Sequence, residues 1–279
     1  MTETGTLFIV ATPIGHLDDI TLRAISILNQ VDIVAAEDTR HSQKLLQHYD
    51  IKTRMTSLHD HNESQRAKQL IEHLLKGSNV ALISDAGTPL ISDPGYSLVN
   101  QCRQAGVTVV PVPGACAAIA AMSASGMATD QFRFNGFLPV KQMAKQQTLG
   151  LLKAEIATTV FYESPRRIVN TLEAIIAVLG PERKVVIAKE ITKAFETFYA
   201  DTAENALAWL LDDPNHQRGE FVLMVAGVKI DGEDLPQEAL SLLESLIKEL
   251  PLKKAAAITA EHYGLKKNAL YQYGLSLND

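Results

Sequence analysis

The fold class is decided by one stretch, Val80-Ala-Leu-Ile-Ser84-Asp85-Ala-Gly87-Thr88-Pro89-Leu-Ile-Ser92-Asp93-Pro94-Gly95. The apolar run at 80–83 is typical of a strand that is buried on both faces of a parallel sheet. The segment 84–95 is dense in Ser, Asp, Gly and Pro, and it is longer than a plain strand-to-helix connection needs. Ligands of open α/β sheets bind outside the carboxyl ends of the strands. We therefore expect a ligand-binding loop here, with an ordinary turn as the plain alternative.

The segment after this loop predicts a helix. Asp93 and Pro94 have the chemistry of an N-cap and a first turn, and Gly106 suits the end of the helix. Apolar residues recur between them at helical spacing, at Leu98, Val99, Cys102 and Ala105.

The rest of the chain alternates between strand and helix patterns, which predicts the α/β class. In the first half, strands are expected at 6–10, 31–36, 80–83 and 107–112 with helices between them, as in a mostly parallel sheet. In the second half they are expected at 132–138, 158–162, 185–189, 195–200 and 221–226. Two of these follow each other without a helix, so we expect a mixed sheet there. Ser164 and Thr202 are the expected caps of two helices. The predicted domains are 1–118 and 119–230, followed by a helical tail over 231–279.

Composition limits the class of protein. The chain has 279 residues, of which 46% are hydrophobic and 21% charged, as in a globular protein with a substantial core. No apolar run approaches the roughly 18 residues of a membrane span, and no signal-peptide pattern is evident, so we expect a cytoplasmic protein. Cys102 and Cys116 stand outside any Cys/His cluster. They predict buried thiols in a reducing compartment and no metal site.

The charge is unevenly distributed. The net charge of −6 argues against a general nucleic-acid binder. Between Arg133 and Lys193, however, ten Lys and Arg stand against five Glu and no Asp, a net of +5 that leaves −11 elsewhere. This segment is either a solvated surface or a surface for an anionic partner.

Motifs for the common nucleotide, hydrolase and metalloprotease sites are absent, because the chain contains no GxxxxGK, GxGxxG after the first strand, GxSxG or HExxH. Acid/base groups do gather at two expected strand ends. Glu163 lies beside Tyr162 and close to Arg166 and Arg167. Glu190 follows Lys189 and precedes Lys193 and Glu196. Such groups can tune a proton acceptor, or they can be plain surface ion pairs.

A series of ordered motifs resembles one family, the ribosomal RNA small-subunit methyltransferase I family of the tetrapyrrole-methylase superfamily. The resemblance runs from about residue 5 to 230, and more weakly through the tail. The motifs are Thr6-LFIVATPIGHLDDITLRA, Ala36-EDTRHS, Ser57-LHDHNE, Ser84-DAGTPLISDPGY, Pro113-GACAAIAAMSASG, Phe134-NGFLP, Phe161-YESPRR and Lys189-EITK.

The resemblance implies two α/β domains of the tetrapyrrole-methylase type with S-adenosylmethionine in the cleft between them, a helical extension, and a homodimer. It also implies 2′-O-methylation of a cytidine ribose in the decoding region of 16S ribosomal RNA within the small ribosomal subunit. Thr12-Pro13-Ile14-Gly15 stands where the tetrapyrrole branch has Gly-Pro-Gly-Asp, which favours the RNA branch. The sequence departs from the family pattern at two positions of these motifs, where His16 replaces a usual Asn and Arg166 a usual His.

The resemblance and the loop chemistry together suggest site residues. Loops without bulky side chains allow close approach of the backbone to a cofactor. The candidates for cofactor binding are Pro13, Gly87, Thr88, Ile91, Cys116, Ala117, Phe137, Leu138, Tyr162 and Ala194. A ribose hydroxyl is a poor nucleophile until it is deprotonated, so a base or a cation is needed near it. The catalytic candidates are Asp85, Glu163, Glu190 and Lys193, in no fixed order.

Two other classes of function stay open. One is a small-molecule methylase that acts on a tetrapyrrole-like acid, and the other is a catalytically silent RNA-binding subunit. We expect no aromatic-rich pocket for a flipped base, which favours methylation of a ribose over a base. Four lysines against one acid between residues 251 and 272 predict that the tail helps to dock RNA as a helix–turn–helix-like unit; the alternative is that they form only a solvated face.

Overall fold

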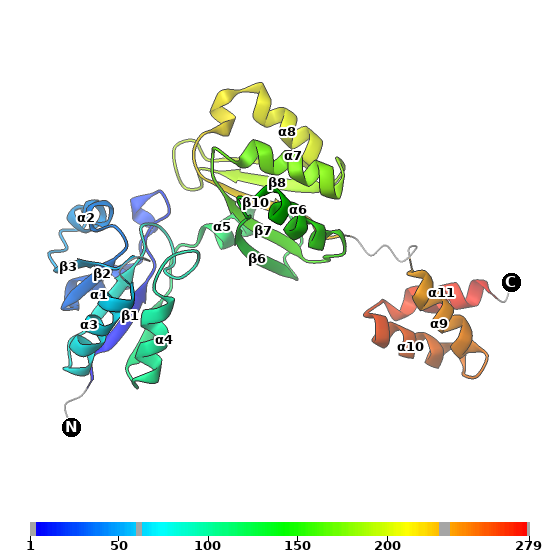
Figure 1. Cartoon of the computed structure of the whole chain (residues 1–279), viewed down its shortest axis with the longest axis horizontal. Helices are drawn as coiled ribbons and strands as arrows, with labels where there is room; N and C mark the ends of the chain where they lie inside the picture. Colours follow the sequence, from blue (N-terminus) through cyan, green and yellow to red (C-terminus); the bar gives the residue numbers. More distant parts are fainter. Residues whose placement is uncertain (1–3, 60–62, 229–234, 278–279) are drawn as a thin grey trace. The chain divides into compact units, whose positions relative to one another are not determined.

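The structure is a computed structural model that describes residues 4–59, 63–228 and 235–277 (Figure 1). It divides into two compact units, residues 1–227 and 228–279. The first unit contains two five-stranded sheets, each covered by helices, which we call the first and the second α/β domain. The predicted α/β class with a helical extension is confirmed.

The first sheet is entirely parallel, in the order β3-β2-β4-β1-β5. Its strands are β1 (Thr6–Val10), β2 (Ile33–Ala36), β3 (Met55–Ser57), β4 (Val80–Ile83) and β5 (Thr108–Val112). α1 (Leu22–Gln30) and α2 (Thr39–His48) pack on one face, and α3 (Glu63–Leu75) and α4 (Tyr96–Gln104) on the other. β4 is central and all its residues are buried, as its apolar run predicts.

The second sheet is mixed, as predicted, in the order β6-β7-β10-β8-β9. Its strands are β6 (Phe132–Phe137), β7 (Thr158–Glu163), β8 (Lys184–Lys189), β9 (Thr197–Thr202) and β10 (Phe221–Val225). β6 and β7 are parallel, and the other neighbours are antiparallel. α6 (Gln142–Gly150), α7 (Ile168–Leu179) and α8 (Ala203–Asp212) cover one face, and α5 (Ala117–Ala124) covers the other.

Two of the predicted helix caps are wrong, and the third is confirmed. α4 begins at Tyr96 with Gly95 as its N-cap at φ +123°, so Asp93 does not cap it. The cap must be small, because a Cβ on Gly95 would lie 2.7 Å from Cδ2 of Leu82. α7 begins at Ile168, where the Ser164 carbonyl and not its hydroxyl accepts the backbone N–H of Ile168 at 3.1 Å. The Thr202 hydroxyl does accept the backbone N–H of Asn205 at the start of α8.

The second unit is a bundle of three helices, α9 (Gln237–Ile247), α10 (Leu252–Tyr263) and α11 (Lys267–Ser276), around a small core of Leu and Ala. Gly264 ends α10 in the left-handed conformation at φ +65°, which allows the sharp turn into α11. Among the residues that the structure describes, no helix is both long and apolar enough to cross a membrane.

Candidate cofactor and active site

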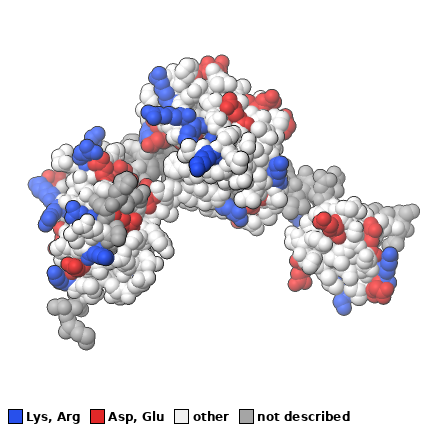
Figure 2. All heavy atoms as spheres, viewed as in Figure 1, with Lys and Arg blue, Asp and Glu red and all other residues white. Residues whose placement is uncertain are grey.

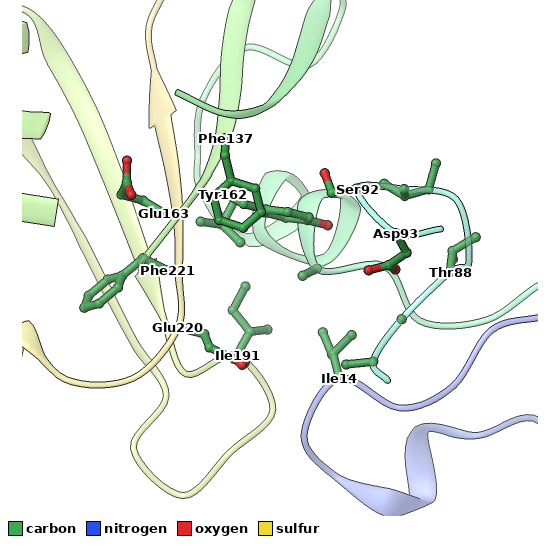
Figure 3. A pocket seen from close by; sticks show the side chains of 15 residues that line it. Ile14, Thr88, Ser92, Asp93, Phe137, Tyr162, Glu163, Ile191, Glu220 and Phe221 are labelled. Atoms are coloured by element: carbon green, nitrogen blue, oxygen red, sulfur yellow. The ribbon is translucent and has the colours of Figure 1, made fainter. Parts of the chain in front are cut away.

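A pocket lies where strand-end loops of the two α/β domains meet (Figure 3). Its cavity volume is about 210 Å³, and the pocket is open to solvent. Residues from both domains line it: Ile14, Ala86, Gly87, Thr88, Ile91, Ser92, Asp93, Ala117, Phe137, Tyr162, Glu163, Ile191, Glu220, Phe221 and Val222.

The first wall of the pocket consists of loops that follow β1, β4 and β5. Thr12 and Gly87 exchange two backbone hydrogen bonds, of 2.9 and 3.0 Å, which tie the β1 loop to the β4 loop. The Thr88 hydroxyl donates to the Ala115 carbonyl at 3.0 Å and ties in the β5 loop. Gly87 has φ +84°, and a Cβ there would lie 3.3 Å from Cγ2 of Ile14, which also lines the pocket. The positive φ therefore favours glycine, and an added side chain would crowd Ile14.

Asp93 is the main acidic group that the sequence reasoning missed. Instead of capping α4, its half-buried side chain lines the pocket beside Ser92 (Figure 3). Burial raises the pKa of Asp93 to about 6, with the hydrogen bond of Ser84 lowering it and the charge of Asp85 raising it further. The carboxyl group can therefore change its protonation state close to neutral pH. The signal that could have identified it is its place in a strand-end loop.

The second wall is aromatic, which contradicts the expectation of no aromatic-rich pocket. Phe137, Tyr162 and Phe221 line it, and the ring centroids of Phe137 and Tyr162 are 5.9 Å apart. Phe137 follows a bulge at Gly136 (φ +60°) and stays 53% exposed. The Tyr162 hydroxyl accepts the backbone N–H of Ala118 at 3.3 Å, and burial raises the pKa of Tyr162, so the phenol stays neutral.

The Glu163 carboxylate is held by neighbouring donors. The residue is 3% exposed, and Oε1 accepts the backbone N–H of Ser164 at 2.9 Å and lies 3.2 Å from Nε of Arg167. Oε2 accepts the Thr171 hydroxyl at 2.9 Å. Both oxygens therefore have partners within the second domain.

Lys193 lies between two carboxylates at the end of β8 and the start of β10. Its Nζ is 2.9 Å from Oε1 of Glu190 and 2.7 Å from Oε2 of Glu220, a pocket residue. Although burial opposes it, hydrogen bonds to Glu220 and Glu190 raise the pKa of Lys193, so the ammonium stays charged. Although burial also opposes it, the hydrogen bond from Lys193 lowers the pKa of Glu190.

This β8 loop also touches the first domain. The backbone N–H of His16 donates to the Thr192 hydroxyl at 3.0 Å. A Cβ on Gly15 would lie 2.6 Å from Cγ of Lys193, so the absence of a side chain at Gly15 allows the two loops to meet. Ile14 and Ile191, which adjoin this contact, both line the pocket.

The structure brings half of the predicted site residues to the pocket wall. These are Gly87, Thr88, Ile91, Ala117, Phe137, Tyr162 and Glu163. The others are placed around it. Pro13 is buried outside the lining, Leu138 belongs to the core of the second domain, and Ala194 is exposed. Cys102 is buried as predicted, whereas Cys116, the N-cap of α5, is only partly buried, so the prediction of a buried thiol is wrong there.

The three remaining catalytic candidates are also outside the lining. Asp85 accepts the backbone N–H of Asp38 at 3.0 Å and so links the β4 loop to the β2 loop. Glu190 and Lys193 lie in the network described above. Among the described residues, no group of three or more His, Cys, Asp or Glu side chains is arranged to hold a metal ion.

The fold and the pocket belong to the class of the tetrapyrrole methylases. The family model described as Tetrapyrrole (Corrin/Porphyrin) Methylases matches residues 6–207, and the model described as RsmI C-terminal HTH domain matches residues 233–278. The crystal structure of uroporphyrin-III C-methyl transferase from Thermus thermophilus complexed with S-adenyl homocysteine has a TM-score of 0.55. It is 17% identical and covers 80% of this chain and 97% of its own, so it supports the fold alone.

Curated relatives narrow the class. The chain is 58% identical over 275 residues to the ribosomal RNA small subunit methyltransferase I of Haemophilus influenzae, with 98% of this chain and 97% of that protein covered. It is also 58% identical over 273 residues to the protein of the same name from Pasteurella multocida, with the same coverage. The chain belongs to the ribosomal RNA small subunit methyltransferase I family.

Proposed function

We propose that this chain transfers a methyl group from S-adenosylmethionine to the 2′-oxygen of a cytidine ribose in the decoding region of 16S ribosomal RNA. The observation that carries the proposal is the pocket between the strand-end loops of two α/β domains, in a chain related over nearly its whole length to ribosomal RNA small subunit methyltransferases. The cytidine, the 2′-oxygen and the decoding region come from the family resemblance.

The pocket residues fit the cofactor. The Gly87 backbone, which carries no side chain, leaves room for close approach, and Ile14, Ile91 and Ile191 supply apolar walls for an adenosine. Phe137 and Tyr162 present aromatic rings to the same space, and aromatic rings stabilise a cation near them. S-adenosylmethionine supplies an activated methyl group when it is bound. The uroporphyrin-III C-methyl transferase that shares the fold was crystallised with S-adenyl homocysteine, and the proposal extends that cofactor class to this chain.

The protein's own contribution is to align the ribose and to accept its proton. Asp93 suits the acceptor, because it lies in the pocket and its pKa of about 6 allows it both to ionise and to take up a proton near neutral pH. Lys193 stays charged and would stabilise developing negative charge on the ribose oxygen. In this assignment Glu190 and Glu220 hold Lys193 in place. Asp85 and Glu163 support the loops through Asp38 and Arg167.

The helical unit and a homodimer complete the proposal. The match of residues 233–278 to the helix–turn–helix model supports a role in docking RNA. The apolar residues that stay exposed on the first unit, among them Ile119 and Phe132, are available for a second copy of the chain. We place the protein in the cytoplasm, because small ribosomal subunits are the proposed substrate.

The test is to incubate the protein with labelled S-adenosylmethionine and either small ribosomal subunits or a tetrapyrrole precursor. Digestion of the RNA and mass spectrometry should then identify a ribose-methylated cytidine. A base-methylated nucleoside would refute the ribose assignment. Transfer only to the precursor would support the small-molecule alternative, and binding of subunits without any transfer would support a silent RNA-binding subunit.

A further inference from the structure

We propose that the substrate RNA is held next to the pocket by two exposed cations of the second domain, Lys141 and Arg166, which we call the basic rim. The inference rests on the proposed function and adds to it the place where the RNA strand beside the target nucleotide contacts the protein.

The basic rim lies at the pocket edge of the second sheet. β6 ends at Phe137 and the parallel strand β7 ends at Glu163, and both residues line the pocket. Lys141 and Arg166 are in the loops that follow these two strands. Because the strands are parallel neighbours, their carboxyl ends and the loops after them lie at one edge.

A network of hydrogen bonds fixes the two loops to each other. The Arg167 guanidinium lies 3.2 Å from Oε1 of Glu163 and also donates to the Leu138 carbonyl, so it joins the end of β7 to the segment after β6. Behind it, Nζ of Lys145, which is 2% exposed, donates to Oδ1 of Asn170 at 2.8 Å and ties α6 to α7. The basic rim is therefore held on a fixed frame.

Ion pairing separates the basic rim from the other cations between Arg133 and Lys193. Lys141 and Arg166 are exposed, and within the described parts of the chain neither has a carboxylate oxygen within 4.0 Å. Four of the others are ion-paired: Arg133 with Glu155, Arg167 with Glu163, Lys184 with Asp201, and Lys193 with Glu190 and Glu220. Lys145 and Lys189 are buried, and Arg183 is half-buried. Lys153 is exposed but lies at the opposite edge of the sheet. The excess positive charge of this segment is thus free for a ligand at the pocket edge.

The partner that fits is a single RNA strand. Figure 2 shows a group of Lys and Arg side chains on the second α/β domain of a chain whose net charge is −6. Cations without internal partners attract phosphates, whereas the acidic remainder of the surface repels them, so an RNA strand should bind at the basic rim. Val140 and Met143, beside Lys141, are 81% and 73% exposed and offer apolar contact to unstacked bases. A duplex would bury its bases and leave these two residues without a partner.

The chain also offers a matched control at the opposite edge of the sheet. Lys184 begins β8, whose other end leads into the pocket loop, and Lys153 follows α6 shortly before the start of β7. Both are exposed. The variant Lys153→Gln/Lys184→Gln therefore removes the same charge from the same domain away from the pocket.

The test compares Lys141→Gln/Arg166→Gln with this control and with the unaltered full-length chain. Binding to small ribosomal subunits is measured over a series of salt concentrations. Two lost contacts to single-stranded phosphates should flatten the slope of log K against log salt by about 1.4, and should weaken binding roughly 25-fold at 0.1 M salt. The control should change neither quantity, and all three proteins should keep the same melting temperature and affinity for S-adenosylmethionine.

An unchanged slope in the rim variant would overturn the inference, and so would an equal change in the control. If the rim variant changes the oligomeric state and leaves the slope unchanged, the basic rim is a contact between copies of the chain and the inference is wrong. Methyl transfer by the unaltered chain distinguishes failure of the rim assignment from failure of the proposed function. When the chain transfers methyl groups to subunits but the rim variant keeps its slope, only the rim assignment fails. When it transfers none, the proposed function fails, whereas the slope of the rim variant still decides whether RNA contacts the basic rim.

Discussion

Replacement of Gly87 by valine should separate cofactor binding from folding. Gly87 has φ +84°, and a Cβ there would already lie 3.3 Å from Cγ2 of Ile14. The two further methyl groups of valine would occupy space between the pocket wall and the cofactor, and overpacking of this kind costs about 1–3 kcal/mol. Expressed as affinity, this predicts roughly 5- to 150-fold weaker binding of S-adenosylmethionine.

Gly126→Val is the matched control for this prediction. Gly126 also has a positive φ of +71°, but an added Cβ would meet nothing within 4 Å, and the residue is outside the pocket lining. Both variants should lose about 1–3 kcal/mol of stability from the strained backbone. Calorimetric titration with S-adenosylmethionine should show a loss only for Gly87→Val. Undiminished affinity in that variant, or an equal loss in Gly126→Val, would remove Gly87 from the cofactor site.

Three further predictions concern the proton acceptor Asp93, the charged Lys193 and the helical tail. Asp93→Asn should abolish a rise in transfer rate with pH that is centred near 6. Because the folded-state pKa of Asp93 is raised, the free energy of unfolding of the unaltered chain should fall as the pH rises from about 4 to 6, and the variant should lack this fall. An unchanged pH–rate profile in the variant would exclude Asp93 as the proton acceptor. Lys193→Ala should lower kcat far more than the affinity for S-adenosylmethionine, whereas an equal loss of both would make Lys193 a binding residue. Replacing the exposed tail lysines with Gln should flatten the salt dependence of subunit binding with no change in cofactor affinity, and an unchanged slope would make the tail structural; these are Lys253, Lys254, Lys266 and Lys267.

The sequence predicts the parts of the fold that local patterns determine. The apolar run of β4 and the Gly- and Pro-rich loop after it are where the spacing predicts them, because a strand that is buried on both faces needs such a run. β3 is not predicted, since it has only three half-buried residues and no apolar pattern. Asp93 is misassigned because an Asp before a Pro has the same chemistry whether it caps a helix or faces a ligand.

Three of the missed pocket residues depend on pairing between distant strands. β10 runs antiparallel to both β7 and β8, so Phe221 pairs with Glu163 on one side and with Lys189 on the other. The start of β10 therefore lies beside the ends of its neighbours and adds Glu220, Phe221 and Val222 to the pocket. No local pattern reveals this, because the first residues of a strand carry a ligand site only when the strand is reversed. The same pairing explains how Lys193 comes to have two carboxylate partners.

The backbone gives independent support for a site at this place. Of the five non-glycine residues with positive φ in the described chain, four lie in two loops: Leu90 and Ser92 in the β4 loop, and Glu190 and Thr192 in the β8 loop. Each such residue costs about 1–3 kcal/mol, and a β-branched residue such as Thr192 is especially unfavourable there. The β8 loop keeps this conformation because the Glu190 backbone N–H donates to the Glu220 carbonyl at 2.9 Å and the Thr192 backbone N–H donates to the Glu196 carboxylate at 2.6 Å.

The strain is therefore concentrated at the pocket, one loop from each α/β domain. Replacing Thr192 with glycine would relieve the strain in the β8 loop, because glycine adopts positive φ about as readily as negative φ, and so would test whether the strain serves the fold or the site. If the strain serves only the fold, Thr192→Gly should stabilise the chain and leave its activity intact. If the strained loop positions Lys193 and the contact with His16, the same variant should lose activity because the loop is free to leave that position. The concentration of four strained residues around one pocket favours the second outcome, since a fold without function would have no reason to keep them.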